Sequence, residues 1–309
     1  MLNPQIDPFM EKWTSEWSVL PADATMPERR AQFEIIARNM ALPKPDDVDD
    51  SAEHWIESEA GRVRVRVYRH TGGGTQDCLI YFHGGGFMQG SPETHADITS
   101  RIASWNGQTV VSVDYALLPD HHFPVAFLQG CDVATWVRAN AGMLGIDPAR
   151  IAIGGDSAGG NLAAGVALAM KEFGFIGQLL IYPVTEFERD RPSMIENAEA
   201  PLLQTKGMER MNRLLVGGEE NLQMLREDTR VAPYYAKDHS GLAPAFVAVA
   251  QYDPLRDSGV LYAGKLKEAG VPVELDMGDG LIHGYLRAME YCDDSQAKLR
   301  KMVDWLKAR

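Results

Sequence analysis

A serine flanked by glycines stands out as a candidate nucleophile. Residues 154–161 read GGDSAGGN and contain the pattern Gly-x-Ser-x-Gly, with Ser157 at its centre. The apolar run IAI precedes this pattern and a stretch of small residues follows it, as at a sharp strand-to-helix turn that presents a serine hydroxyl at the start of a helix. A plain glycine-rich turn would have the same letters, but the flanking runs favour a nucleophilic Ser157.

A second glycine-rich segment could stabilise negative charge. The letters HGGGF directly follow the apolar run CLIYF, and glycines let the backbone approach a substrate without an intervening Cβ. A tetrahedral intermediate of acyl transfer needs N–H donors aimed at its oxyanion. We expect the N–H groups of Gly85, Gly86 and Ala158 to supply them. His83 and Gly84 would support the loop, and His83 would order it rather than transfer protons.

An acid and a histidine follow the serine in the order that a catalytic triad requires. Asp253 comes directly after the apolar run AFVAVA and its short extension, and His283 follows the run VPVELD. We expect Asp253 to orient His283, and His283 to take the proton of Ser157 and return it to the leaving group. Asp257 and Asp279 are rivals for the acid, but Asp257 should lie inside the next helix and Asp279 too close to His283.

Composition argues against several other classes of function. The 309 residues carry a formal net charge of −13 and no run of Lys or Arg, so nucleic-acid binding is not expected. No run of about 20 apolar residues is present, and the first residues lack a signal-peptide pattern, so we expect a cytoplasmic protein without a membrane span. The odd set Cys78, Cys131 and Cys292 fits reduced, buried thiols, and no histidine spacing supports a metal.

Short apolar runs that alternate with helical stretches must position these residues. The segment GRVRVRVYRH has the two-residue period of a strand with one wet face, and HWIES is a candidate partner. The runs CLIYF, TVVSVD, IAIGG, LLIYP, AFVAVA and VPVELD are separated by stretches long enough for crossover helices. This rhythm predicts an α/β fold with a mostly parallel sheet that helices cover on both faces.

Two segments interrupt this rhythm and could form a helical cap over the site. Residues 1–50 contain two amphipathic helical patterns, the second with a capping box at Thr25 and Glu28, and end in a connection, 42–51, expected to be solvated. Residues 185–230 show helical periodicity without a strand. The catalytic domain would then comprise 51–184 and 231–309. Candidates for the acyl pocket share an apolar side chain: Trp13, Trp17, Phe33, Met208, Met211, Leu214 and Leu215 in these segments, and Phe87 in HGGGF.

These motifs together resemble those of the bacterial hormone-sensitive lipase-like (family IV) esterases. The similarity rests on HGGGF, GDSAGGN, DPLRD at 253–257 and HGY at 283–285, all in the family's order. It implies an α/β-hydrolase fold of about eight strands with a helical cap, and a carboxylesterase for short- to medium-chain acyl esters that needs no cofactor. The sequence departs from the family at Ala116, where DYRLAPE commonly has arginine, and at Tyr285, where many relatives have phenylalanine.

Three hypotheses follow for the function. The first is hydrolysis of a small-molecule ester through an acyl-enzyme at Ser157. The second keeps the site but changes the bond or acceptor, which would make the protein an amidase, a carbamate hydrolase or an acyltransferase. The third is a ligand receptor on the same scaffold, which is disfavoured because Ser157, Asp253 and His283 are all present. Monomer and homodimer are both compatible with the sequence.

Overall fold

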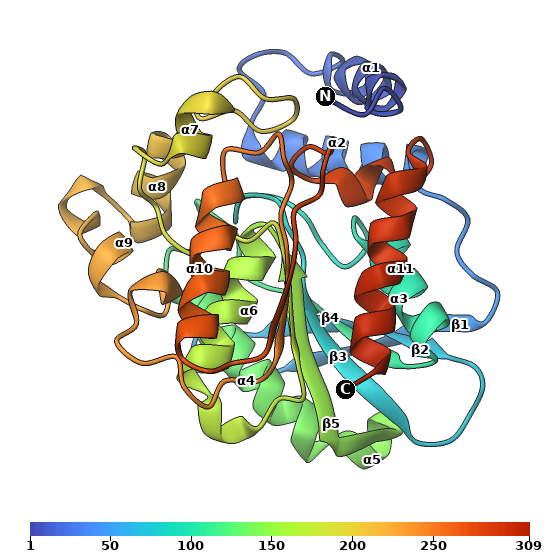
Figure 1. Ribbon diagram of the computed structural model, residues 1–309. Helices are drawn as coiled ribbons and strands as arrows, with labels where there is room; N and C mark the ends of the chain where they lie inside the picture. Colours follow the sequence, from blue (N-terminus) through green and yellow to red (C-terminus); the bar gives the residue numbers. More distant parts are fainter.

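An eight-stranded sheet runs through the centre of the protein (Figure 1). The computed structural model describes residues 1–309. The strand order is β1-β2-β4-β3-β5-β6-β7-β8. The pairs β1–β2 and β2–β4 are antiparallel, and all the remaining neighbouring strands are parallel. The strands are β1 (Val48–Ile56), β2 (Val63–His70), β3 (Gln76–Phe82), β4 (Thr109–Asp114), β5 (Ile146–Asp156), β6 (Gln178–Ile181), β7 (Ala245–Ala248) and β8 (Val273–Asp276). The predicted mostly parallel sheet of eight strands is confirmed.

The first two strands correct one boundary of the sequence prediction. β1 begins at Val48, so the second half of the connection expected at 42–51 belongs to the sheet. The acidic residues there do not all point freely into solvent, since Asp50 accepts a hydrogen bond of 3.0 Å from Arg66 on β2. Arg66 lies on the partly exposed face of β2, and the valines that alternate with the arginines are buried. Cross-strand charge pairing thus accompanies an earlier start of β1 than the apolar pattern of HWIES alone indicates.

Helices cover both faces of the sheet, as predicted. They are α1 (Ile6–Trp17), α2 (Met26–Asn39), α3 (Ala96–Asn106), α4 (Val125–Ala139), α5 (Ala141–Leu144), α6 (Ala158–Ala169), α7 (Pro192–Glu196), α8 (Met208–Val216), α9 (Met224–Glu227), α10 (Arg256–Glu268) and α11 (Asp293–Lys307). One hydrophobic core lies between the sheet and α4, α6 and α10, and a second lies between the sheet and α3 and α11. Figure 1 shows these two layers on opposite sides of the strands.

In Figure 1, α1 and α2 lie at the top of the molecule, α7 and α8 at the upper left and α9 below them on the left. Residues 185–230 contain α7, α8 and α9 and no strand. α2 begins with the expected capping box, in which Thr25 accepts from the Glu28 N–H and the Glu28 carboxylate accepts from the Thr25 N–H. α1 and α2 bury Ile6 and Ile36 in the second core. The N-terminal helices therefore pack against the sheet and its helices rather than standing apart from them.

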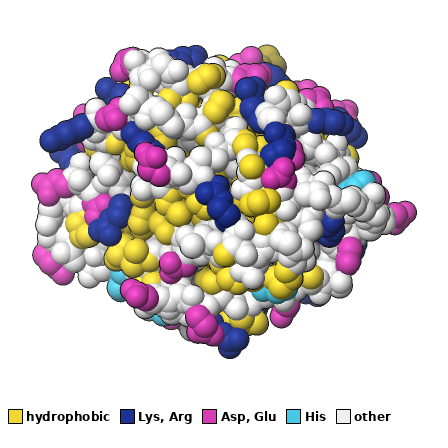
Figure 2. Space-filling model, turned by 90° about the horizontal axis from the view of Figure 1, so that it is seen from below, with side chains coloured by type: hydrophobic (Ala, Val, Ile, Leu, Met, Phe, Trp, Pro, Cys, Tyr) yellow, Lys and Arg dark blue, Asp and Glu magenta, His cyan; other side chains and the backbone are white.

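Charge is dispersed over the opposite face of the protein. Figure 2 shows basic side chains there singly or in small groups, interspersed with acidic and hydrophobic ones.

None of the helices has both the length and the apolar character needed to cross a bilayer.

Candidate active site

Ser157 occupies a strained turn between β5 and α6. Its backbone has φ 56° and ψ −118°, and its N–H donates to the Ile181 carbonyl of β6 at 2.8 Å. A Cβ at Gly159 would lie 1.9 Å from the carbonyl oxygen of Phe82, so only glycine permits this approach of α6 to β3. Strain of this kind persists only where the surrounding structure enforces it. The sheet and the start of α6 thus hold the Ser157 hydroxyl in one place.

His283 lies between this serine and Asp253. Its Nε2 is 2.9 Å from Ser157 Oγ, and its Nδ1 is 2.8 Å from Asp253 Oδ2. A parallel bridge between Tyr252 and Ile282 brings the loops after β7 and β8 into register, which places the acid and the histidine side by side. Asp253 is fully buried, and its other carboxylate oxygen accepts the Leu255 N–H at 2.8 Å. The three groups form one continuous hydrogen-bonded chain.

The rival acids lie elsewhere. Asp257 is in the first turn of α10, where its carboxylate accepts the N–H of Ser193 at 2.8 Å. Asp279 is exposed, and no hydrogen bond joins it to His283. Among the acids weighed from the sequence, only Asp253 contacts the imidazole.

The glycine-rich loop after β3 runs beside Ser157. Gly85 has φ 133°, and a Cβ there would lie 2.0 Å from the Gln89 carbonyl oxygen, so this turn requires glycine. The N–H groups of Gly85 and Gly86 have no acceptor within the protein. Ala158 is the first residue of α6. Backbone N–H groups at this end of a helix have no intrahelical partner, and the positive end of the helix dipole lies there. These donors suit a developing anion.

A cavity of about 520 Å³ opens over the serine. Its lining joins the serine and histidine to side chains of α1, α2, α8 and the segment before α8. The candidate pocket residues that line it are Trp13, Trp17, Phe33, Phe87, Met208 and Met211. Leu215, expected to face the pocket, is instead buried in the first core and borders a separate small cavity, because its side of α8 faces α4 rather than the serine. Leu214 packs against the same core.

Comparisons with known proteins identify the family. A family model described as alpha/beta hydrolase fold matches residues 79–287. The esterase LipI of Mycobacterium tuberculosis is 38% identical over 290 residues, which cover 92% of this chain and 88% of that protein. The ethyl acetate hydrolase of Pseudomonas putida is 32% identical over 321 residues, with 99% and 98% of the two chains covered. The chain belongs to the hormone-sensitive lipase-like esterases of the α/β-hydrolase superfamily.

Solved structures agree with this assignment. The hyperthermophilic esterase from the archaeon Pyrobaculum calidifontis superposes on the esterase described here with a TM-score of 0.89 at 33% identity, covering 99% of this chain and 98% of that one. The expected α/β-hydrolase fold is thus confirmed, and the protein is a carboxylic-ester hydrolase.

In this esterase, His83 directly precedes the glycines of the loop and contacts the backbone of Gly84. Its ring is fully buried, stacks on Tyr115 at 4.3 Å between centroids, and donates from Nδ1 to the Gly84 carbonyl at 2.9 Å. Burial lowers the pKa of His83 to about 3, with a further contribution from nearby His95. A neutral imidazole that hydrogen-bonds to Gly84 is consistent with the ordering role expected from the sequence.

Asp156 is a residue whose role the sequence reading missed. It is buried directly before the serine, where it accepts the Tyr81 hydroxyl at 2.8 Å and the Gly84 N–H at 2.9 Å. Burial alone would raise the pKa of its carboxyl, but His95, Arg287 and the Tyr81 hydrogen bond together lower it well below the usual range. A carboxylate thus ties the glycine loop to the serine turn. The sequence signal was present, since an acid at the end of a buried apolar strand must find polar partners.

Arg287 is a second missed residue, one turn after His283. Its Nη2 lies 2.6 Å from His95 Nε2, and its guanidinium stacks over the Phe33 ring at 4.5 Å on the cavity wall. Tyr182 is a third, because its ring packs against the His283 imidazole at 4.8 Å. Both contacts join segments far apart in the chain, so no local pattern could have predicted them.

The two residues that depart from the family's usual motifs, Ala116 and Tyr285, have defined contacts in the structure. Ala116 donates its N–H to the side chain of Gln129 at 2.7 Å. Tyr285 is fully buried, and its ring meets Tyr182 edge-on at 5.3 Å. No group of three or more His, Cys, Asp or Glu side chains is arranged to hold a metal ion.

Proposed function

We propose that the esterase hydrolyses its substrates through an acyl-enzyme on Ser157, with His283 as general base and acid and Asp253 as the orienting acid. The observation that carries this proposal is the unbroken chain of hydrogen bonds from Asp253 Oδ2 through both nitrogens of His283 to Ser157 Oγ. An Nδ1–H that donates to the carboxylate leaves Nε2 free to accept the serine proton.

The reaction then proceeds in two stages. Ser157 Oγ attacks the ester carbonyl as its proton passes to His283 Nε2, and the tetrahedral intermediate collapses when His283 protonates the departing alcohol. Water next gives its proton to the same nitrogen and attacks the acyl carbon. Collapse of the second intermediate releases the carboxylic acid and restores the serine hydroxyl. Asp253 stabilises the imidazolium that forms in each stage.

The oxyanion of both intermediates would be held by backbone donors. Gly85, Gly86 and Ala158 present N–H groups beside the serine that the protein's own acceptors leave free. Such preorganised donors act in a site shielded from water, where each is worth a factor of about 10²–10³ in kcat.

The cavity favours short- to medium-chain acyl esters. Its volume of about 520 Å³ is bounded by aromatic residues of α1 and α2 and by methionines of α8, which are apolar and, for methionine, adaptable. In this proposal residues 1–47 and 185–230 act as a cap that selects the acyl chain, over a catalytic domain of residues 48–184 and 231–309 that includes the whole of β1.

Initial hydrolysis rates test the proposal. The substrates are p-nitrophenyl acetate, butyrate, octanoate and palmitate, given to the wild type and to Ser157→Ala. We expect turnover that peaks at short or medium chains and is lost by a factor of about 10³ or more in Ser157→Ala. Full turnover by Ser157→Ala would refute the mechanism, and a peak at palmitate would refute the assigned chain length.

A further inference from the structure

Arg30 of α2 reaches from the cap into the catalytic domain. Its guanidinium donates from Nε to the Met88 carbonyl at 2.9 Å and from Nη2 to the Leu118 carbonyl at 2.6 Å. Its Nη1 pairs with the exposed carboxylate of Asp120 at 2.8 Å. Arginine presents its donors in a rigid planar fork, so the two contacts with carbonyls fix the guanidinium relative to both loops, while the ion pair with Asp120 lies at the surface.

The two carbonyls that Arg30 binds belong to segments already joined to each other. The Phe87 carbonyl accepts the Leu118 N–H at 2.8 Å, which attaches the glycine loop to the segment after β4. Within residues 85–89 the Gly85 carbonyl closes a tight turn. Arg30 provides the only side-chain hydrogen bond to residues 85–89. The part of the loop that carries the free N–H groups thus depends on one side chain from the cap.

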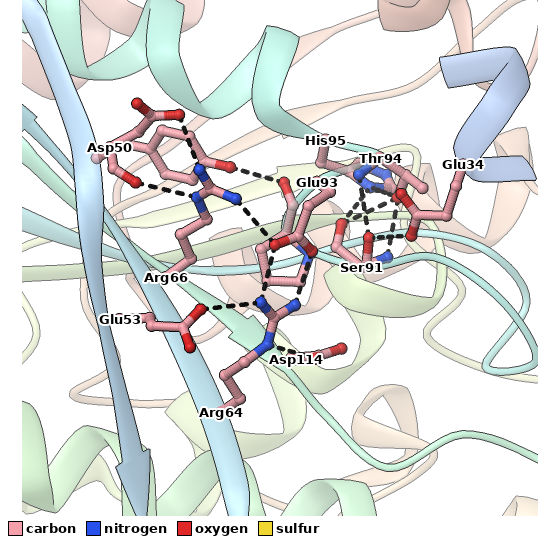
Figure 3. A network of polar contacts seen from close by, with 12 residues as sticks. Glu34, Asp50, Glu53, Arg64, Arg66, Ser91, Glu93, Thr94, His95 and Asp114 are labelled. Carbon is pink, nitrogen blue, oxygen red and sulfur yellow. Dashed lines mark hydrogen bonds and ion pairs between the residues drawn. The ribbon is translucent and has the colours of Figure 1, made fainter. Parts of the chain in front are cut away.

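α2 contacts the far end of the same loop one helical turn later. Glu34 accepts the Ser91 hydroxyl at 2.5 Å, as Figure 3 shows, and Ser91 and Thr94 exchange hydrogen bonds between their backbones and side chains. Thr94 contacts Nδ1 of His95, and His95 Nε2 lies 3.2 Å from the Gly84 nitrogen. The polar face of α2 therefore contacts the stretch after the glycines at two points, Met88 and Ser91.

This far end is itself fixed to the sheet. Both Arg64 and Arg66 of β2 hold the Glu93 carboxylate, at 2.7 Å and 3.0 Å (Figure 3). Burial alone would raise the pKa of Glu93, but its hydrogen bonds to the two arginines lower it to about 2, so the pairing is present at neutral pH. The stretch after β3 is thus held firmly at both ends, and Arg30 restrains its middle.

We propose that Arg30 is a positioning residue for ester hydrolysis: by binding the Met88 and Leu118 carbonyls it holds Gly85 and Gly86 where an oxyanion forms. The inference rests on the proposed function of these glycines as donors. It makes the cap part of the machinery that stabilises the transition state, beyond its role in selecting the acyl chain. Since donors misplaced by about 1 Å lose much of their effect, the loss of Arg30 should act on kcat.

The test compares Arg30→Gln with the wild-type full-length chain on p-nitrophenyl butyrate. We expect kcat to fall about tenfold while KM changes by less than about threefold, because the interaction that is lost acts in the transition state. The inhibition constant of 1,1,1-trifluoro-2-heptanone should rise about tenfold, since its adduct with the serine carries an oxyanion. Arg30→Lys keeps the charge but loses the planar fork, so its kcat and inhibition constant should lie between those of the wild type and Arg30→Gln. This variant also allows the test if Arg30→Gln does not fold.

Two control variants separate positioning from a general effect on the cap. Arg38→Gln removes the same charge from the exposed side of α2, where the arginine makes no hydrogen bond, and Asp120→Asn breaks only the surface ion pair of Arg30. Both should keep kcat and the inhibition constant within about twofold. Unchanged kcat and inhibition in Arg30→Gln and Arg30→Lys, even with a lowered melting temperature, would overturn the inference. Turnover by Ser157→Ala would instead overturn the proposed function.

Discussion

The acid of the proposed triad can be tested one carboxylate at a time. Asp253→Asn keeps the shape of the side chain but favours the wrong imidazole tautomer, so we expect kcat on p-nitrophenyl butyrate to fall by about 10³–10⁴. Asp257→Asn is the matched control. Its carboxylate binds the Ser193 N–H and Arg256, so the change should lower stability and leave kcat within about threefold. A larger loss of kcat in Asp257→Asn than in Asp253→Asn would reassign the acid.

A buried neutral histidine makes stability depend on pH. The pKa of His83 is lowered by burial to about 3 in the folded protein, from an ordinary value near 6.5 in the unfolded chain. At a pH between these two pKa values, His83 binds a proton in the unfolded chain but not in the folded protein. The free energy of unfolding should therefore fall as the pH is lowered through this window, with a limiting slope of about 1.4 kcal/mol per pH unit for this one group.

Denaturant titrations between pH 5 and about 6.5 measure this slope, where carboxylates contribute less than histidines. His83→Asn retains a donor for the Gly84 carbonyl without the titrating imidazole, and it should flatten the pH dependence. His121→Asn removes an exposed imidazole and should leave the slope as it is in the wild type. Equal slopes in all three proteins would show that His83 is not neutral in the fold.

At the scale of the helix, α1 contributes an aromatic wall to the cavity. Trp17 stacks on Phe33 of α2 at 6.1 Å and meets Trp13 edge-on at 6.0 Å. Trp17→Ala removes a large part of this wall, so longer acyl chains gain room. We expect the ratio of kcat/KM for octanoate over acetate to rise by about threefold or more, since each methylene accommodated in an apolar pocket is worth about 1 kcal/mol.

The matched control is Trp105→Ala in α3. Trp105 is also partly buried against the second core, but it does not line the cavity and packs against Arg300 instead. This variant should lose stability without a change in the acyl-chain ratio. If the two tryptophan variants had the same chain-length profile, α1 would not select the acyl chain.

The order of elements, the serine turn and the glycine loop could be predicted because they follow local rules. Ser157 needs glycines at fixed offsets, and the strands of the sheet have a two-residue or fully apolar pattern. Arg30 escaped notice because its partners are backbone carbonyls 58 and 88 residues away, which any sequence offers. Leu215 was misplaced because an amphipathic pattern shows that one side of α8 is buried but not whether core or cavity covers it.

At the scale of the whole molecule, α1 and α2 of the proposed cap share a hydrophobic core with the sheet, α3 and α11. Phe9 of α1 is fully buried, and its ring lies 6.0 Å from that of Tyr291, just before α11. The second core joins α1 and α2 to α3 and α11 without interruption. Two segments that share one core stabilise each other, so neither is expected to unfold alone.

Phe9→Ala tests this coupling across the whole chain. A cavity at a fully buried phenylalanine costs about 3–5 kcal/mol, and the cost should appear as one shifted transition rather than as a second, earlier one. Esterase activity, tryptophan fluorescence and far-UV circular dichroism, followed in the same denaturant series, should change together in the wild type and the variant. Ile195→Ala on α7 is the control, because that side chain is 69% exposed and its loss should cost less than about 0.5 kcal/mol. If activity and fluorescence were lost at a lower denaturant concentration than the circular dichroism signal, the cap would be a separate folding unit. The hydrogen bonds of Arg30 to the Met88 and Leu118 carbonyls would then break before the sheet unfolds.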